Sequence, residues 1–355
     1  MSEPHMPEEP TNNNDTLLQV EDLQVEFATY GGTVQAVRGV SFAVEAGKTL
    51  AIVGESGCGK SVTVQSIMGL TPMPPGRITK GAAYLRGHNI LGQKTINGKD
   101  IRGDQIGMIF QDPMTSLNPT MNIGNQIAET LIVHRGYSKK QAFARAVELL
   151  ELSKIPEADK RARQYPFEFS GGMLQRAMIA MAIACEPDIL IADEPTTALD
   201  VTIQAQILDL LGDLQRETGM AIILITHDLG VVARMADDVL VMYAGQVVEH
   251  GSVDSIFYES AHPYTLGLRA AMPSNDPERN QELTPIDGSP PDLFQPPVGC
   301  GYAPRCPYAM KVCAAQPPAV HHIGPGHEAR CWLHDPANTQ AVPAIHNATQ
   351  VAHHE

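Results

Sequence analysis

A glycine-rich loop between an apolar segment and a helical one constrains this chain more than any other feature. The loop follows the apolar residues 49–53 and precedes a helical pattern at 60–68. Such a loop points successive backbone N–H groups and the positive end of a helix at one place, which suits a polyphosphate. In this pattern Lys60 would reach the β- and γ-phosphates and the Ser61 hydroxyl would hold Mg²⁺. The predicted phosphate site comprises Gly54, Glu55, Ser56, Gly57, Cys58, Gly59, Lys60, Ser61 and Val62.

A second apolar segment ends in two carboxylates. Residues 189–192 are followed directly by Asp193 and Glu194. In open α/β sheets, ligands bind where the strands end. We therefore expect Asp193 to order Mg²⁺ through water, and Glu194 to align and polarise an attacking water.

The periodicity of the rest of the chain predicts an α/β fold. Alternating apolar and polar residues over 17–42, with a Gly-Gly turn, predict antiparallel strands. Helical spacing follows over about 113–168, where Ser138-Lys139-Lys140-Gln141 is a capping-box pattern. Buried strands at 188–192 and 221–225, with a helix near 202–217 between them, predict a mostly parallel sheet covered by helices. We place this unit at 16–263, after a disordered polar stretch at 1–15.

The composition changes after residue 263. Proline and glycine become frequent and four cysteines gather, which predicts a separate, loop-rich element at 264–335 and a disordered tail at 336–355. Four soft thiolates in a reducing compartment select an iron–sulfur cluster or zinc. No C-x-x-C pair is present, which weakens the zinc-ribbon interpretation. The cysteines are Cys300, Cys306, Cys313 and Cys331.

Charge and hydropathy exclude several classes of function. The formal net charge is −15 and no block of Lys and Arg is present, which disfavours a nucleic-acid partner. The polar N-terminal stretch has no apolar signal region, and no apolar run approaches the length of a membrane span. We therefore expect a chain that is not exported, whose membrane role would come through partners. Its six cysteines would be thiols or metal ligands rather than disulfides.

An ordered set of short motifs carries a family resemblance. Ser170-Gly171-Gly172 opens a helix and is by itself an ordinary turn. It lies between Gln111 and the carboxylates at 193–194, and His227 follows the next apolar strand. Over roughly residues 17–260 this order resembles the ATP-binding cassette family.

The resemblance implies a P-loop NTPase fold with a RecA-like parallel core, an antiparallel β subdomain and a helical insert. Two such cassettes would sandwich two ATP molecules, with Ser170, Gly171 and Gly172 of one contacting the γ-phosphate held by the other. Gln111 would touch Mg²⁺ and sense the membrane partner, and His227 would stabilise γ-phosphate charge. The further residues implied are Asp200 of the D-loop (198–200) and, for stacking on adenine, Phe27 with Tyr30 as the alternative.

The chain departs from the common family pattern at two positions. The signature of the family is the segment Ser170-Gly171-Gly172. Met173 follows it where many cassettes have Gln, but the serine and the two glycines that would bind the anion are present. Cys58 occupies a loop position where Ser is common. A thiol beside a helix N-terminus and Lys60 tends toward the thiolate, so we expect maleimide to inactivate the enzyme and MgATP to protect it, with an inert buried thiol as the alternative.

Longer segments narrow the resemblance to the ATPase subunits of bacterial oligopeptide and dipeptide permeases. These segments extend the likeness to about residue 334, and they include 108–119, 178–185, 192–206, 242–245 and 262–265. The resemblance implies a peripheral ATPase on the cytoplasmic face of the inner membrane. Its partners would be a second, similar ATPase in a heterodimer, two membrane-spanning permease subunits and an extracytoplasmic peptide-binding protein. Some similar subunits carry an iron–sulfur cluster on the four cysteines, which favours [4Fe-4S] here, with zinc or free thiols as alternatives.

Three functions other than peptide import use a P-loop and predict different sequence features. A chromosome-maintenance or DNA-repair ATPase would place long coiled coils between Gln111 and Ser170, where this chain has only a short insert. A P-loop kinase would lack the Ser-Gly-Gly signature and the switch histidine. Import of nickel or another small solute stays open as the runner-up, and the cysteines favour peptides.

Overall fold

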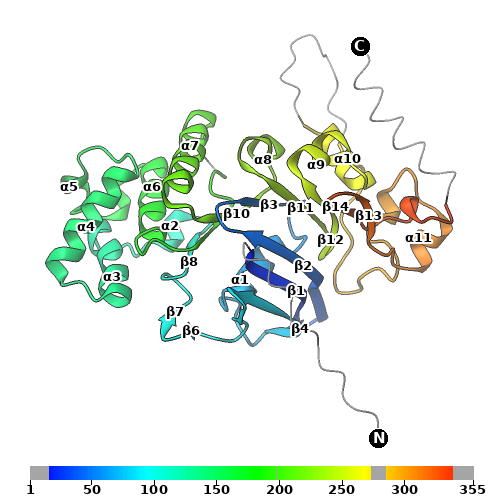
Figure 1. The fold of residues 1–355 in the computed structure, drawn as a ribbon, viewed down its shortest axis with the longest axis horizontal. Helices are drawn as coiled ribbons and strands as arrows, with labels where there is room; N and C mark the ends of the chain where they lie inside the picture. The colour runs from blue at the N-terminus through cyan, green and yellow to red at the C-terminus, as the bar shows by residue number, and fades with distance from the viewer. Residues whose placement is uncertain (1–15, 198, 273–284, 339–355) are drawn as a thin grey trace, which may run out of the picture.

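A mixed sheet of eight strands forms the centre of the molecule (Figure 1). The structure is a computed structural model and describes residues 16–197, 199–272 and 285–338. The predicted disorder of 1–15 and of most of the tail, 339–355, falls outside these residues. In spatial order the strands are β13 (His321–Gly324), β14 (His327–Ala329), β12 (Gln246–Ser252), β11 (Asp238–Tyr243), β3 (Thr49–Val53), β10 (Ala221–Thr226), β9 (Ile189–Asp193) and β8 (Ile106–Ile109). The five strands from β11 to β8 run parallel, as predicted, and the remaining three pair antiparallel.

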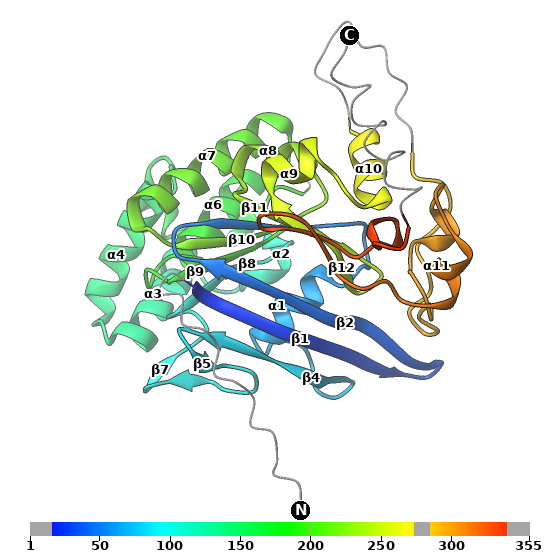
Figure 2. The same cartoon turned by 45° about the vertical axis from the view of Figure 1, so that its right-hand side comes forward.

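A second, antiparallel sheet lies against one face of the central one (Figure 2). Its strands, in order, are β2 (Gly32–Glu45), β1 (Thr16–Thr29), β4 (Gly76–Leu85) and β5 (His88–Asn89), and a short pair follows, β6 (Thr95–Ile96) with β7 (Lys99–Asp100). The β1–β2 hairpin confirms the antiparallel strands predicted over 17–42. Helix α1 (Lys60–Ile67) packs its buried face between the two sheets, in one core with both.

Helices cover the other face of the central sheet (Figure 1). Successive residues of β9 point to opposite faces: Leu190 and Ala192 pack under the helices, whereas Ile189 and Ile191 pack toward α1. Burial on both faces explains why these strands are continuously apolar in the sequence. The covering helices are α7 (Val201–Thr218), α8 (Leu229–Met235), α9 (Val253–Tyr258) and α10 (Pro263–Ala270).

The insert predicted over 113–168 is helical. Its first residues form α2 and its last form a 3-10 turn, and α6, which carries the signature, packs against it. The predicted capping box opens α4, where the Ser138 Oγ accepts from the Gln141 N–H and the Gln141 Oε1 accepts from the Ser138 N–H. The elements here are α2 (Pro113–Ser116), α3 (Ile123–Arg135), α4 (Lys139–Leu152), α5 (Ala158–Arg161), η1 (Pro166–Glu168) and α6 (Gly171–Ala182).

The cysteine-containing segment is joined to the core rather than separate from it. Strand β14 extends the central sheet by pairing with β12, through Glu249 opposite Ala329 and His250 opposite Glu328. The rings of Tyr243, Tyr264 and Tyr302 are buried in one cluster that also includes Val53 of β3. The predicted loop-rich extension is present, and the structure adds that it shares the core: a short loop-rich segment has little core of its own and buries its apolar side chains against β11 and β12.

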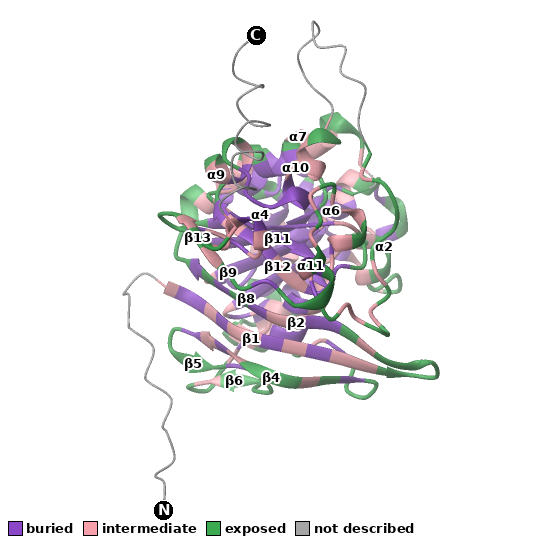
Figure 3. Cartoon of the chain, turned by 90° about the vertical axis from the view of Figure 1, so that its right-hand side faces the viewer, coloured by how far each residue is buried: buried purple, intermediate pink, exposed green. Residues whose placement is uncertain are grey.

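Most of the extension lies in turns and short elements on one side of the molecule (Figure 1). Besides most of α10, its regular elements in the described residues are η2 (Ala303–Arg305), α11 (Lys311–Ala315), β13, β14 and η3 (Trp332–His334). Burial is concentrated in the central strands, and the tip of the β1–β2 hairpin is exposed (Figure 3). No helix in the described ranges is both long and apolar enough to cross a bilayer.

Candidate nucleotide site

The glycine-rich loop connects β3 to α1 in a conformation that requires glycine at two positions. Gly54 has φ +151° and Gly59 has φ +101°. A Cβ at Gly54 would lie 2.2 Å from the Met242 carbonyl oxygen, and one at Gly59 would lie 2.4 Å from the Ala36 carbonyl oxygen. The loop is therefore held between β2 and β11, with no space for a side chain at either position.

Lys60 and Ser61 begin α1 and turn their side chains into the loop and toward β9. The Lys60 Nζ donates to the carbonyl oxygens of Gly54 at 2.7 Å and of Glu55 at 3.1 Å. The Ser61 Oγ donates to the Asp193 Oδ1 at 2.8 Å. Asp193 is 3% exposed, and this burial raises the pKa of its carboxyl while the hydrogen bond from Ser61 opposes the rise. A hydroxyl and a carboxylate that meet in this way fit the hard oxygen ligands of Mg²⁺.

Glu194 is held where β9 ends, at φ +48°. Its Oε2 accepts hydrogen bonds from the Gln111 Nε2 and the Thr197 Oγ1, each at 3.0 Å. The His227 Nδ1 lies 3.5 Å from the Glu194 Oε1. The structure therefore brings together three side chains that were predicted separately from the sequence. Thr197 was not predicted, and no local pattern marks it out.

The signature and the P-loop do not meet within one chain. Ser170 caps α6 without a side-chain hydrogen bond to the helix, and none of the described residues is a hydrogen-bond partner of its hydroxyl. A Cβ at Gly172 would lie 2.9 Å from Ile203 on α7, so the signature packs closely on the helix that Asp200 caps. No hydrogen bond links Ser170, Gly171 or Gly172 to residues 54–61 in the part of the chain that the structure describes. Of the D-loop segment, residue 198 lies outside the described residues.

Two family descriptions match the chain. The ABC transporter family matches residues 37–197, and "Oligopeptide/dipeptide transporter, C-terminal region" matches residues 248–313. The chain is 56% identical over 327 residues to the oligopeptide transport ATP-binding protein OppD of Bacillus subtilis, covering 92% of this chain and 91% of that protein. The chain belongs to the ATP-binding proteins of oligopeptide and dipeptide ABC transporters.

Two further relatives and a solved structure agree with this assignment. The dipeptide transport protein DppD of Bacillus subtilis is 55% identical, with 92% of this chain and 97% of that protein covered. OppD of Salmonella typhimurium is 53% identical, with coverages of 89% and 93%. A dimeric structure of the cassette MJ0796 with ADP and Pi superimposes with a TM-score of 0.58 and 28% identity, over 67% of this chain and 99% of that one. The fold is therefore the P-loop ABC cassette with the extension of the oligopeptide and dipeptide transporters.

The two aromatic candidates for adenine differ in exposure. Phe27 is partly buried, and a Cβ at Gly76 would lie 3.1 Å from its ring. Tyr30 lies at the hairpin tip and is fully exposed. The extension runs beside this hairpin: the Gln35 N–H donates to the Leu293 carbonyl at 3.1 Å, and the Phe294 ring lies against the hairpin glycines. Val62 is half-buried on α1 and packs toward the same core as Phe27.

Cys58 does not behave as its position in the ABC P-loop suggested. Its side chain is buried, at 5% exposure, with the Lys60 Nζ 4.0 Å from the sulfur. Burial raises the pKa of the Cys58 thiol, and this effect exceeds the lowering by Lys60. The expected tendency toward the thiolate was wrong, because desolvation of the sulfur outweighs the nearby positive charge.

The four extension cysteines are all free thiols. They lie near one another, and the Cys300 N–H donates to the Cys313 carbonyl at 2.7 Å. Burial raises the pKa of Cys306 to about 11 and that of Cys331 to about 12. Within the described ranges, no three His, Cys, Asp or Glu side chains are placed to hold a metal ion together. The thiols as arranged here do not fit an iron–sulfur cluster or zinc.

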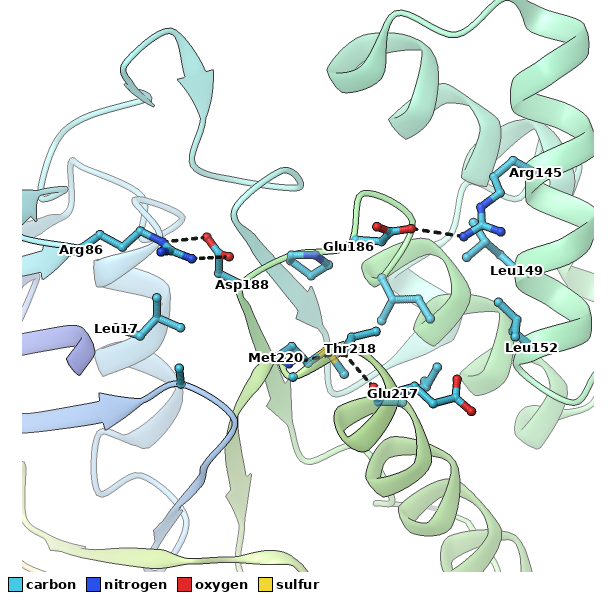
Figure 4. Close-up of a pocket in the computed structure, with 15 residues that line it drawn as sticks. Leu17, Arg86, Arg145, Leu149, Leu152, Glu186, Asp188, Glu217, Thr218 and Met220 are labelled. Carbon is cyan, nitrogen blue, oxygen red and sulfur yellow. Dashed lines mark hydrogen bonds and ion pairs between the residues drawn. The ribbon is translucent and has the colours of Figure 1, made fainter. Parts of the chain in front are cut away.

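A cleft of about 570 Å³ lies at the amino ends of the central strands (Figure 4), whereas the glycine-rich loop lies at their carboxyl ends. Leu17, Asp188 and Met220 line it, next to the amino ends of β1, β9 and β10. The ion pairs Arg86–Asp188 and Arg145–Glu186 lie in it (Figure 4). Since the P-loop follows the carboxyl end of β3, this cleft is separate from the nucleotide site.

Proposed function

We propose that this chain is the ATP-hydrolysing subunit of a membrane importer for oligopeptides or dipeptides. The observation that carries the proposal is the union, in one chain, of a complete set of cassette residues around Lys60 and Glu194 with the C-terminal region of oligopeptide and dipeptide transporters. The similarity to OppD and DppD proteins over nine-tenths of the chain supports both ATP hydrolysis and a role in peptide transport.

Within one subunit, one group of residues would bind ATP and Mg²⁺, and another group would act on the attacking water and the γ-phosphate. The N–H groups of the P-loop and the Lys60 ammonium would bind the β- and γ-phosphates, and Ser61, Asp193 and Gln111 would hold Mg²⁺, which neutralises charge on the transferred group. Glu194, oriented by Gln111, would accept the proton of the attacking water. His227 would stabilise charge on the γ-phosphate from its place beside Glu194.

The reaction would require a second cassette. The Ser170 hydroxyl and the Gly171 and Gly172 amides at the start of α6 would close on the ATP of the facing subunit, and Asp200 would lie at that interface. ATP binding would close a heterodimer with a similar ATPase, and hydrolysis would reset it. The match to a dimeric cassette structure supports this arrangement.

The membrane partners would dock on the helical insert. Two permease subunits would carry the pathway, an extracytoplasmic binding protein would deliver peptide, and the ATPase would lie on the cytoplasmic face of the membrane. The insert offers exposed apolar side chains: Phe167 is 71% exposed and stacked on Tyr165, and Met114 is 59% exposed on α2, just after Gln111. Movement of the insert would thus be transmitted to Gln111 and from there to Glu194.

The [4Fe-4S] cluster, with zinc as its alternative, remains a prediction from the sequence. The described thiols do not form such a site, so no step of the cycle is assigned to it. Iron and acid-labile sulfide assays on anaerobically purified protein test the cluster, and a zinc assay tests its alternative. Absence of iron, sulfide and zinc would leave free thiols.

The decisive experiment is ATPase activity of the assembled transporter. We expect peptide-loaded binding protein to stimulate hydrolysis, and Glu194→Gln to abolish the stimulated rate. Stimulation by a nickel-loaded binding protein and not by peptide would instead support the related importers of nickel or small solutes. Activity that does not respond to any binding protein would contradict import.

A further inference from the structure

A buried arginine of the extension reaches the P-loop. The Arg305 Nη1 lies 2.6 Å from the Glu55 Oε2, and the Arg305 Nη2 lies 3.0 Å from the Glu55 Oε1. This is the two-point geometry in which Arg and carboxylate groups bind most strongly. The residues are far apart in sequence, and the Arg305 side chain is only 5% exposed. The pair therefore joins the extension to the second residue of the loop, with the arginine buried and the Glu55 side chain 27% exposed.

Hydrogen bonds to several other groups fix the Arg305 guanidinium in this position. Its Nη1 also donates to the Tyr243 hydroxyl at 3.1 Å, and its Nε and Nη2 donate to the carbonyl oxygens of Asp287 and Ile286. All five N–H donors of the guanidinium thus have acceptors. The hydrogen bonds to Glu55 raise the pKa of Arg305 further above its ordinary value, so its charge is permanent. Its place at the end of η2, after the buried Tyr302, orients the side chain.

A second contact reaches the backbone of the same loop residue. The Glu55 N–H donates to the Tyr264 hydroxyl at 2.9 Å, and Tyr264 is fully buried on α10. Tyr264 packs on both Tyr243 and Tyr302. One packed group thus holds Glu55 by its side chain and by its main chain.

Charge gives this contact a function beyond packing. Glu55 belongs to the loop that would hold a triphosphate, and an unpaired carboxylate there would repel the phosphate charges. Arg305 cancels the charge of Glu55 and turns its carboxylate toward the extension. We propose that Arg305 is a positioning residue for ATP binding, through which the extension neutralises Glu55 and holds the P-loop in its binding conformation. This inference concerns ATP alone, so its outcome does not depend on the transported cargo.

The test is equilibrium binding of ATP to the full chain with Mg²⁺ chelated, so that no hydrolysis occurs. Arg305→Met leaves the Glu55 charge unpaired, and we expect the Kd for ATP to rise about tenfold. Adding Glu55→Gln removes that charge, so the double variant should return to within about threefold of the original Kd. In the presence of Mg²⁺, the KM of Arg305→Met should rise while kcat stays within about twofold, because Glu194 and Gln111 are untouched.

Arg330→Met is the matched control. Arg330 belongs to the same extension and donates to the Val247 carbonyl, without a hydrogen bond or ion pair to the P-loop. The Kd of the Arg330→Met variant for ATP should equal that of the original protein. If Arg305→Met does not fold, Arg305→Lys keeps the charge without the two-point geometry and should raise the Kd about threefold. A folded Arg305 variant with unchanged Kd, or a raised Kd that Glu55→Gln does not lower, would overturn the proposal.

Discussion

Gln111 and Glu194 are joined by a 3.0 Å hydrogen bond from the amide Nε2 to the carboxylate Oε2. The bond links the start of the helical insert to the end of β9, so a shift of the insert moves the group that would activate water. Because Thr197 donates to the same oxygen, the Oε1 is left for water and for His227. This geometry makes Glu194 suited to chemistry rather than to binding.

Replacing Glu194 should separate binding from hydrolysis. Glu194→Gln removes the proton acceptor, and we expect phosphate release to fall by at least about 100-fold while the Kd for ATP changes little. The bound state should accumulate as a closed pair, visible by size-exclusion chromatography of the chain with its partner ATPase. Glu217→Gln, at the distant end of α7, is the matched control and should be active. Loss of ATP binding in Glu194→Gln would show that the carboxylate has another role.

Asp193 should make Mg²⁺ use sensitive to acid. Its pKa is raised by burial, so a larger fraction is protonated at mildly acidic pH than for an ordinary aspartate, and a protonated carboxyl does not hold Mg²⁺. The Mg²⁺ concentration needed for half-maximal ATPase activity should therefore increase as the pH is lowered. ATP binding without Mg²⁺, measured over the same pH range, is the control. An unchanged Mg²⁺ requirement down to pH 5 would contradict this role.

Cys58 should resist alkylation in the folded protein. Burial raises its pKa and hides the sulfur, so both the thiolate and access for a reagent are lacking at pH 7. Peptide mass spectrometry after maleimide treatment should find Cys58 unmodified in native protein and modified in guanidinium chloride. Rapid native labelling of this one cysteine would refute the buried geometry.

His262 should make the fold less stable in acid. Burial lowers its pKa to about 4, from 6.5 in the unfolded chain, so unfolding takes up a proton between these values. Stability is therefore complete above about pH 6.5 and declines as the pH falls toward 4, by about 2 kcal/mol between pH 8 and pH 5.

The measurement is urea unfolding at pH 8 and pH 5 of wild type and His262→Asn, since asparagine can also cap α10. The variant should lose about 2 kcal/mol less than wild type over this range. His322→Asn, at an exposed histidine, should lose as much as wild type. Equal losses in all three proteins would exclude His262 as the cause.

The sequence predicted the parts of this molecule whose signals are local. The P-loop, the acids at 193–194 and the Ser138 capping box are short patterns whose neighbours in sequence are also their neighbours in space. The order of motifs then placed Gln111 and His227, although only the structure shows both beside Glu194. The contact of Arg305 with Glu55 could not be predicted, because nothing local to either residue signals its partner.

Two features could not be read from local sequence: the burial of Cys58 and the pairing of the extension with the central sheet. The environment of Cys58 was judged from the adjacent Lys60, but desolvation depends on the β2 and β11 residues that cover the loop. The way the extension joins the core could not be predicted, because proline and glycine dominate its sequence. Its few strand residues nevertheless pair with β12, where the backbone hydrogen bonds need no distinctive side chains.

The hydrogen bond between the Gln35 N–H and the Leu293 carbonyl joins two segments that are made far apart in time. Strand β2 is the edge of the antiparallel sheet, and Leu293 of the extension pairs with part of that edge. While the ribosome is still making the last fifth of the chain, this part of the edge is bare and able to pair with other nascent polypeptides. A cassette truncated after residue 263 would retain its catalytic groups and yet be prone to aggregate.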